Sequence, residues 1–215
     1  IKSAPVVLCQ ERLGRNTAMA IVANSGCSNV YTGEPGLTDA REMTALTATA
    51  LGSDPEDILI ASTGVTGQRL PIDMIKDGIR QIALSTEGGH ELAKAIMTTD
   101  TRPKETAVIV RAGDDKFTIG GIAKGSGMIH PNMATMLSFL TTDAAVEPVF
   151  LRSALHQAAD VSFNMISVDG DTSPSDTVLL LANGLAKNKT ISADSPLAQI
   201  FEQALTQVCR YLAKT

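Results

Sequence analysis

The stretch from Lys124 to Leu137 holds residues whose types and spacing suit a chemical reaction. It begins with a lysine beside glycines, bends at Pro131-Asn132 and reaches Thr135 at the start of an apolar run. Glycine permits left-handed backbone and proline fixes one dihedral angle, so we expect a constrained loop that delivers Thr135 to the first position of a strand. A threonine hydroxyl needs a base beside it, and its own α-amine becomes that base once the chain is cut in front of it.

A second candidate site is Thr63-Gly64, which follows the apolar run 57–61. Acyl transfer passes through an oxyanion, and one preorganised hydrogen-bond donor lowers such a barrier by about 2.7–4 kcal/mol. A strand that ends in Thr-Gly, where backbone can approach closely, suits that work. On the residues alone, however, a strand-to-helix turn that requires glycine is the preferred interpretation.

These motifs together resemble the ornithine acetyltransferase family, also called the bifunctional glutamate N-acetyltransferases. Ala134-Thr135-Met136-Leu137 matches the autocleavage context of that family letter for letter. Four further stretches are family-like: Asn24-Ser25-Gly26, Ser62-Thr63-Gly64-Val65, residues 121–128 and residues 167–172. Composition alone favours an ordinary β-branched strand residue at Thr135. The ordered match over nearly the whole chain reverses that interpretation.

The resemblance implies self-cleavage between Ala134 and Thr135, within one catalytic domain 1–215. Residues 1–134 are then the α-chain part and residues 135–215 the β-chain part, and family members assemble as α2β2 heterotetramers. The implied reaction is ping-pong: Thr135 takes the acetyl group from N-acetylornithine and passes it to glutamate, in arginine biosynthesis. An α-amine has an unperturbed pKa of about 7.7–8.0, so much of it is neutral near physiological pH.

The resemblance also assigns roles to individual residues. It places the oxyanion hole at the Thr63 hydroxyl and the Gly64 amide. A lysine and a threonine in the family motifs contact substrate along with the nucleophile Thr135, and they correspond to Lys124 and Thr98, with Thr99 as the alternative to Thr98. A lysine can hold an α-carboxylate as a point charge. On the residues alone, without the family resemblance, we would interpret Lys124 as a solvated surface charge.

Composition and charge exclude several classes of partner. The net charge of −5, with no cluster of lysine or arginine, argues against nucleic acid and against an anionic membrane surface. The histidines share no metal spacing, and residues 169–176 depart from a calcium loop because Pro174 stands where glycine is required. We therefore expect no metal and no bound cofactor, with acetyl-CoA as a substrate of some family members.

The three scattered cysteines predict a reducing compartment. With the resemblance, that compartment is the cytoplasm, or the mitochondrial matrix for a fungal protein. Family members extend beyond both ends of this chain, so we expect a fragment that lacks a first segment and the final third. Two alternatives stay open: a self-processing N-terminal-nucleophile aminopeptidase or amidase that passes the acyl group to water, and an inactive piece without catalysis.

Periodicity predicts the elements that must position these residues, in an α/β chain with layered sheets and helices. The resemblance implies an α-β-β-α sandwich of the N-terminal-nucleophile type. The expected strands are 18–23, 57–61, 106–110, 116–122, 135–141, 165–168 and 177–182. The expected helices are 38–52, 71–82, 87–97, 147–161 and 195–212, with residues 5–12 as a short helix or strand, residues 24–29 as a loop, and Thr38 or Asp39 as an N-cap.

Overall fold

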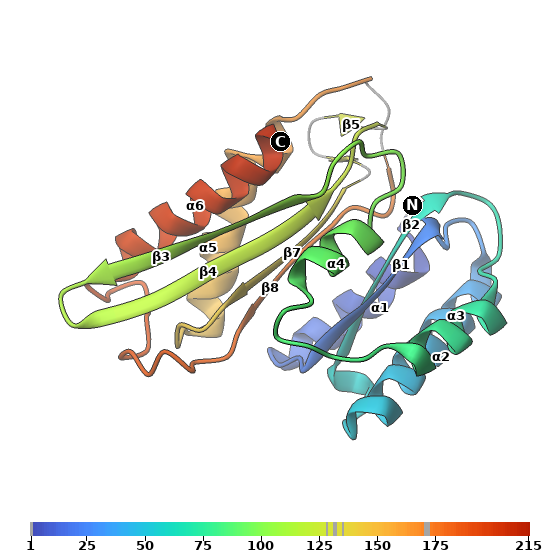
Figure 1. Ribbon diagram of the computed structural model, residues 1–215, viewed down its shortest axis with the longest axis horizontal. Helices are drawn as coiled ribbons and strands as arrows, with labels where there is room; N and C mark the ends of the chain where they lie inside the picture. Colours follow the sequence, from blue (N-terminus) through green and yellow to red (C-terminus); the bar gives the residue numbers. More distant parts are fainter. Residues whose placement is uncertain (1, 128, 131–132, 135, 170–172) are drawn as a thin grey trace. The chain divides into compact units, whose positions relative to one another are not determined.

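The computed structural model describes residues 2–127, 129–130, 133–134, 136–169 and 173–215 (Figure 1). Its elements group into two compact units along the chain. The first unit comprises Ile1–Thr99 with Ser173–Thr177, and the second comprises Asp100–Thr172 with Val178–Thr215. Both units combine strands with helices, which confirms the predicted α/β class with sheets flanked by helices.

The first unit is built on a parallel strand pair. Its elements are α1 (Ala4–Arg12), β1 (Ala20–Cys27), α2 (Gly33–Leu51), β2 (Ile58–Val65), α3 (Ile72–Gln81) and α4 (Gly89–Ala95), with short 3-10 turns at Leu13–Arg15 and Pro55–Asp57. Parallel strands need a crossover connection, and α2 supplies it between β1 and β2. In Figure 1, α2 and α3 run side by side, and the two helices are in contact.

β2 is buried from its first residue to Thr63 because both of its faces are covered. Ile58, Leu59, Ile60 and Ala61 are all essentially inaccessible. Such a continuous apolar run is typical of a parallel strand buried on both sides. The predicted strand at 57–61 is therefore confirmed, and the structure extends it through Thr63 and Gly64 to Val65.

The second unit is built on a four-stranded sheet in the order β3-β4-β7-β8, in which β3 and β4 pair antiparallel, as do β4 and β7. Its elements are β3 (Lys104–Ala112), β4 (Asp115–Lys124), β5 (Ile129–His130), β6 (Met133–Ala134), β7 (Leu137–Thr142), α5 (Pro148–Asp160), a 3-10 turn (Phe163–Met165), β8 (Thr177–Ala182) and α6 (Ala198–Lys214). The β3–β4 hairpin closes on the two-residue turn Gly113-Asp114, and Gly113 has φ +61°, as a tight hairpin turn requires.

A single apolar core holds α5 and α6 against this sheet, as Figure 1 shows for α6 beside β3 and β4. Phe201 of α6 is its centre, with ring centroids 5.9 Å from Phe117 of β4 and 6.1 Å from Phe150 of α5. Because the sequence has few aromatic residues, Leu140, Leu205 and other aliphatic side chains fill the rest. The core thus joins elements on both sides of the Ala134–Thr135 bond.

The structure corrects three local predictions. The turn-forming residues 24–27 continue β1 instead of leaving it, because their backbone pairs with β2 as far as Cys27. α2 begins at Gly33, so neither Thr38 nor Asp39 is its N-cap, and Pro35 is tolerated in the first turn. Residues 165–168 are not a strand, and the exposed side chains of Met165 and Val168 show that no neighbouring layer buries them.

Other predictions hold with shifted ends. Residues 5–12 are helical, Gly52 ends α2 in the left-handed conformation, and β8 has the predicted bounds. The strand expected at 135–141 is β7, Leu137–Thr142, and Thr135 lies outside the described residues. Among the described helices, none has the length and apolar character that crossing a membrane requires.

Candidate active site

Thr63 and Gly64 lie at the carboxyl end of β2, where that strand touches β1. Gly64 has φ +127°, and a Cβ atom built on it would lie 2.2 Å from the carbonyl carbon of Gly26 and 2.6 Å from the amide nitrogen of Cys27. No side chain fits in that space. The glycine is needed for close backbone approach inside a strand pair, so the strand-to-helix turn favoured by the residues alone is wrong at this position.

The backbone after Gly64 is tied to the segment that follows β1. Both the amide and the hydroxyl of Ser28 donate to the Val65 carbonyl, each at 2.9 Å. The Gly67 amide donates to the Val30 carbonyl at 3.1 Å. These bonds hold the backbone that directly follows Gly64.

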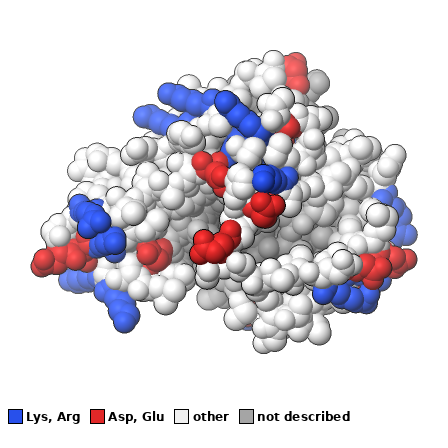
Figure 2. All heavy atoms as spheres, viewed as in Figure 1, with Lys and Arg blue, Asp and Glu red and all other residues white. Residues whose placement is uncertain are grey.

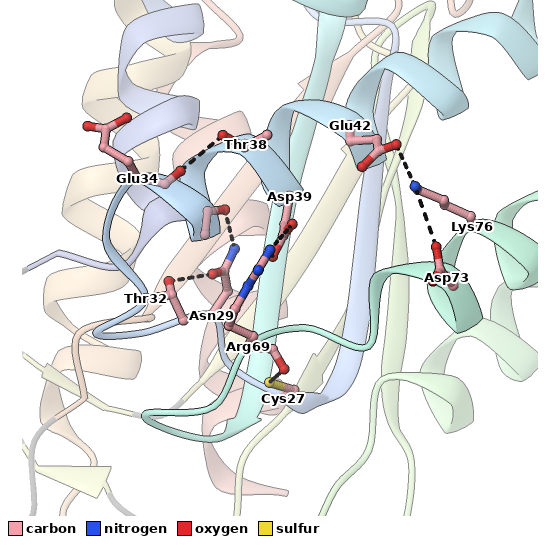
Figure 3. Close-up of polar contacts among 11 residues, drawn as sticks. Cys27, Asn29, Thr32, Glu34, Thr38, Asp39, Glu42, Arg69, Asp73 and Lys76 are labelled. Carbon is pink, nitrogen blue, oxygen red and sulfur yellow. Dashed lines mark hydrogen bonds and ion pairs between the residues drawn. The ribbon is translucent and has the colours of Figure 1, made fainter.

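An ion pair ties the following loop to α2 (Figure 3). Nη2 of Arg69 lies 2.9 Å and 3.1 Å from the two carboxylate oxygens of Asp39, whose side chain is buried. Figure 3 also shows the start of α2, where Thr32 donates to the Asn29 side chain and Asn29 donates to the Gly36 carbonyl. Asp39 therefore anchors the segment after Thr63-Gly64, where the sequence suggested a helix cap.

Lys124 is the last residue of β4 and is 2% exposed. The solvated surface charge expected without the family is therefore wrong. In the register of the sheet, Lys124 lies opposite Leu137, the first residue of β7. Its neighbour Ala123 belongs to the core with α5 and α6, so the strand alternation directs Lys124 to the opposite face of the sheet.

The turn that follows Lys124 contacts two acidic residues. The amide of Gly125 donates to Asp100 at 2.7 Å. A Cβ atom built on Gly127 would lie 3.5 Å from a carboxylate oxygen of Asp169. Asp169, the first residue of the segment 169–176, thus lies beside a glycine of the predicted loop, although residues 170–172 lie outside the described part. Sequence reasoning assigned no role to Asp100, and a lone aspartate there carries no signal of its distant partner.

The remaining predicted residues are distributed as follows. Thr98 and Thr99 are both exposed between α4 and Asp100, so the choice between them stays open. Thr63, Gly64 and Thr98 belong to the first unit and Lys124 to the second. Ala134 ends β6, where it pairs with Ile129, and Thr135 lies outside the described residues.

Charge and burial limit which described groups can act as nucleophiles. Burial raises the pKa of the Cys209 thiol to about 12 and also raises the pKa of Cys9, so both stay protonated at neutral pH. Neither is an activated thiolate.

Among the described residues, no group of three or more His, Cys, Asp or Glu side chains is arranged to hold a metal ion. Figure 2 shows both signs of charge spread over the visible face, among many uncharged residues.

Known proteins match this chain over its whole length. The family model described as the ArgJ family matches residues 1–215. The arginine biosynthesis bifunctional protein ArgJ of Dehalococcoides mccartyi is 56% identical over 214 residues, which cover 100% of this chain and 53% of that protein. The chain thus spans about half the length of the curated relatives that it matches.

Two solved structures share the fold. The arginine biosynthesis bifunctional protein ArgJ of Bacillus halodurans superposes with a TM-score of 0.59 at 42% identity, over 62% of this chain and 72% of that one. The ornithine acetyltransferase of Mycobacterium tuberculosis, complexed with ornithine, superposes with a TM-score of 0.56 at 35% identity, over 61% and 72% of the two chains. Because the family model matches this chain from residue 1 to residue 215, the chain belongs to the ArgJ family.

Proposed function

We propose that the full-length protein containing this chain is an ornithine acetyltransferase of arginine biosynthesis, which moves the acetyl group of N2-acetylornithine to glutamate. One observation carries the proposal: buried Lys124 lies opposite Leu137 in the sheet, and only Met136 separates Leu137 from Thr135 along the chain. A cation suited to an α-carboxylate therefore lies beside the strand that follows the candidate nucleophile. The family match over residues 1–215 supports the same reaction.

The proposed reaction begins with scission between Ala134 and Thr135. The Thr135 hydroxyl attacks the Ala134 carbonyl carbon and the acyl group moves from nitrogen to oxygen. Water then hydrolyses this ester, which leaves a carboxylate on Ala134 and frees the α-amine and the hydroxyl of Thr135. That amine accepts the proton of the Thr135 hydroxyl while the oxygen bonds to the acetyl carbonyl carbon. The bond from that carbon to the ornithine nitrogen then breaks, and the proton passes to the leaving amine. The α-amine of glutamate next attacks the acetyl ester, which yields N-acetylglutamate and restores the hydroxyl.

Four other residues have roles in this proposal. The Thr63 hydroxyl and the Gly64 amide donate to the oxyanion, and the close packing of Gly64 against the backbone of Gly26 and Cys27 supports a fixed backbone there. The Lys124 ammonium pairs with the substrate α-carboxylate, and a hydroxyl at Thr98, with Thr99 as the alternative, contacts the substrate. Because the nucleophile belongs to the protein, the reaction as proposed uses no metal or resident cofactor. Acetyl-CoA is a second acetyl donor for glutamate in some family members.

The proposed assembly is an α2β2 heterotetramer of self-cleaved chains. Its small-molecule substrates are N-acetylornithine and glutamate, and its compartment is the cytoplasm, or the mitochondrial matrix in a fungus. Neither nucleic acid nor a membrane has a part in the reaction.

Substitution of Thr135 in the full-length protein tests the proposal. We expect the unsubstituted protein to give two bands on a denaturing gel, with the second fragment beginning at Thr135 by N-terminal sequencing. Thr135→Ala should give one band and lose acetyl transfer by at least about a thousandfold, because it removes the nucleophile of both steps. Thr135→Ser should retain cleavage and part of the transfer, because it keeps a hydroxyl.

The acceptor separates this function from the alternatives. An aminopeptidase or amidase would release acetate at the same rate with or without glutamate, whereas the proposed enzyme forms N-acetylglutamate. If Thr135→Ala still broke the chain and still exchanged acetyl groups, both the nucleophile and the mechanism would be wrong.

A further inference from the structure

Asp100 holds a buried carboxylate at the point where β4 ends. Its side chain is 0% exposed, and its Oδ1 atom accepts from Lys104 Nζ at 2.5 Å and from the Gly125 amide at 2.7 Å. Lys104 is the first residue of β3, and it lies opposite Ala123 of β4. One oxygen atom therefore joins the start of β3 to the turn that leaves β4.

This arrangement is energetically demanding. A buried carboxylate is unfavourable unless charged and hydrogen-bonding partners surround it, and both kinds of partner are present here. Hydrogen bonds to an ionised group are also shorter and stronger than neutral ones, and the two bonds to Asp100 are 2.5 Å and 2.7 Å long. The carboxylate and its lysine thus hold the Gly125 amide more firmly than a turn at the surface would.

The held residue directly follows Lys124. Gly125 has φ +149°, a backbone conformation that favours glycine, and the chain bends at the two residues that follow it. Lys124 is itself 2% exposed, although a free lysine side chain gains entropy from moving in solvent. The backbone around Lys124 is held in two ways. The pairing of β4 with β7 holds the backbone up to Lys124, and the hydrogen bond from Gly125 to Asp100 holds the residue after it.

We propose that Asp100 and Lys104 are positioning residues for Lys124: their buried ion pair fixes the Gly125 amide and so orients the lysine that binds the substrate α-carboxylate. This inference rests on the proposed function, because it takes the role of Lys124 from there. Asp100 and Lys104 themselves touch no substrate, and they act through the backbone.

Kinetics of the full-length enzyme test the inference. Asp100→Asn removes the charge but keeps an oxygen at the same place, and Lys104→Met removes the cation while the Gly125 contact remains. We expect each to raise KM for N-acetylornithine and for glutamate about tenfold, with a smaller change in kcat, because carboxylate binding is lost in ground and transition states alike. Lys104→Arg keeps the cation and should stay within about twofold of the unsubstituted enzyme.

A donor without the carboxylate separates positioning from general damage. For N-acetylputrescine, kcat/KM should be the same in Asp100→Asn as in the unsubstituted enzyme. Asp143 provides a matched control, because its Oδ1 accepts from the Thr118 amide of the same strand β4 at 2.6 Å. Asp143→Asn should lower the melting temperature as Asp100→Asn does, and should leave KM unchanged.

The double variant decides whether Asp100 acts through Lys124. In a Lys124→Met background, Asp100→Asn should add no further increase in KM, since coupled residues are not additive. Equal losses for both donors, or full additivity, would overturn the inference and leave the proposed function standing. An unchanged KM in Lys124→Met alone would overturn the role of Lys124 and the inference with it. If Asp100→Asn fails to fold, the KM values of Lys104→Met and Lys104→Arg test the same inference.

Discussion

The absence of a side chain at residue 64 keeps two strands in contact. The backbone of Gly26 and Cys27 occupies the space that a Cβ atom on Gly64 would need, and the positive φ of Gly64 disfavours any other residue. Backbone atoms cannot rotate away as a flexible side chain can. Size and conformation therefore both select glycine here, and the proposed oxyanion donor is the amide of this same residue.

We predict that Gly64→Ala destabilises the protein by about 3 kcal/mol, because steric overlap and backbone strain add. Urea unfolding, followed as a shift in midpoint at constant slope, measures the loss. Gly78→Ala is the control, since Gly78 lies in α3 with no atom within 4 Å of a built Cβ. That change should raise stability by up to about 1 kcal/mol through helix propensity. Equal midpoints for the two variants would contradict the close contact.

At the scale of elements, Arg12 joins α1, α2 and β2. Its guanidinium is 2% exposed and donates to the Ile58 carbonyl at 2.5 Å and to Thr44 Oγ1 at 3.0 Å. Burial lowers the pKa of Arg12, which shows that taking the charge from water is unfavourable. The hydrogen bonds offset that cost, since a bond to a charged group contributes about 1.5–3 kcal/mol. β2, whose far end carries Thr63 and Gly64, is thus held to both helices at its start.

We predict that Arg12→Ala lowers the free energy of unfolding by about 2–4 kcal/mol, because it leaves a cavity and two buried acceptors without their donor. Arg15→Ala is the matched control, since the Arg15 side chain is half exposed and forms a long ion pair with Asp57, with 3.7 Å between Nη2 and Oδ1. Exposed pairs contribute at most about 1 kcal/mol, so this variant should be nearly neutral. Chemical denaturation compares the two. A smaller effect at Arg12 than at Arg15 would show that the buried guanidinium does not hold β2.

For the whole molecule, the proposed cut falls inside one compact unit. The second unit contains β3 and β4 before the Ala134–Thr135 bond, and β7, β8, α5 and α6 after it. β4 and β7 pair from Ile119↔Thr142 to Lys124↔Leu137, and one apolar core includes Phe117 on one side of the bond and Phe201 on the other. Each piece would therefore lose a sheet neighbour and much of its core if the two separated.

We predict that the two pieces stay together after scission. In the full-length protein they should co-elute in size-exclusion chromatography under native conditions and separate only in denaturant, because buried apolar area contributes about 25 cal/mol per Å². Phe201→Ala, which opens the shared core, should promote separation, whereas truncation of exposed Tyr211 on the same helix should not. Native elution of free fragments from the unsubstituted protein would contradict the shared core.

Several features could be predicted from the residues because they depend on near neighbours in the chain. Gly52 ends α2 where the predicted helix 38–52 ends, and β8 occupies its predicted range, since capping and short-range periodicity decide such features. The family resemblance also depends only on the order of motifs, and the match along the whole chain confirms it. The roles of Thr63, Gly64, Thr98, Lys124 and Thr135 stay predictions.

Other features were decided only by tertiary structure. Residues 24–27 have the composition of a turn, yet they form strand because β2 supplies backbone partners. The Asp100–Gly125 contact joins residues 25 positions apart, and the buried state of Lys124 needs a sheet to cover it. Sequence patterns record local preference, whereas burial and long-range hydrogen bonds depend on which segments meet in space. The motifs therefore gave the candidate residues, and only the folded chain revealed the contacts around Gly64 and Lys124.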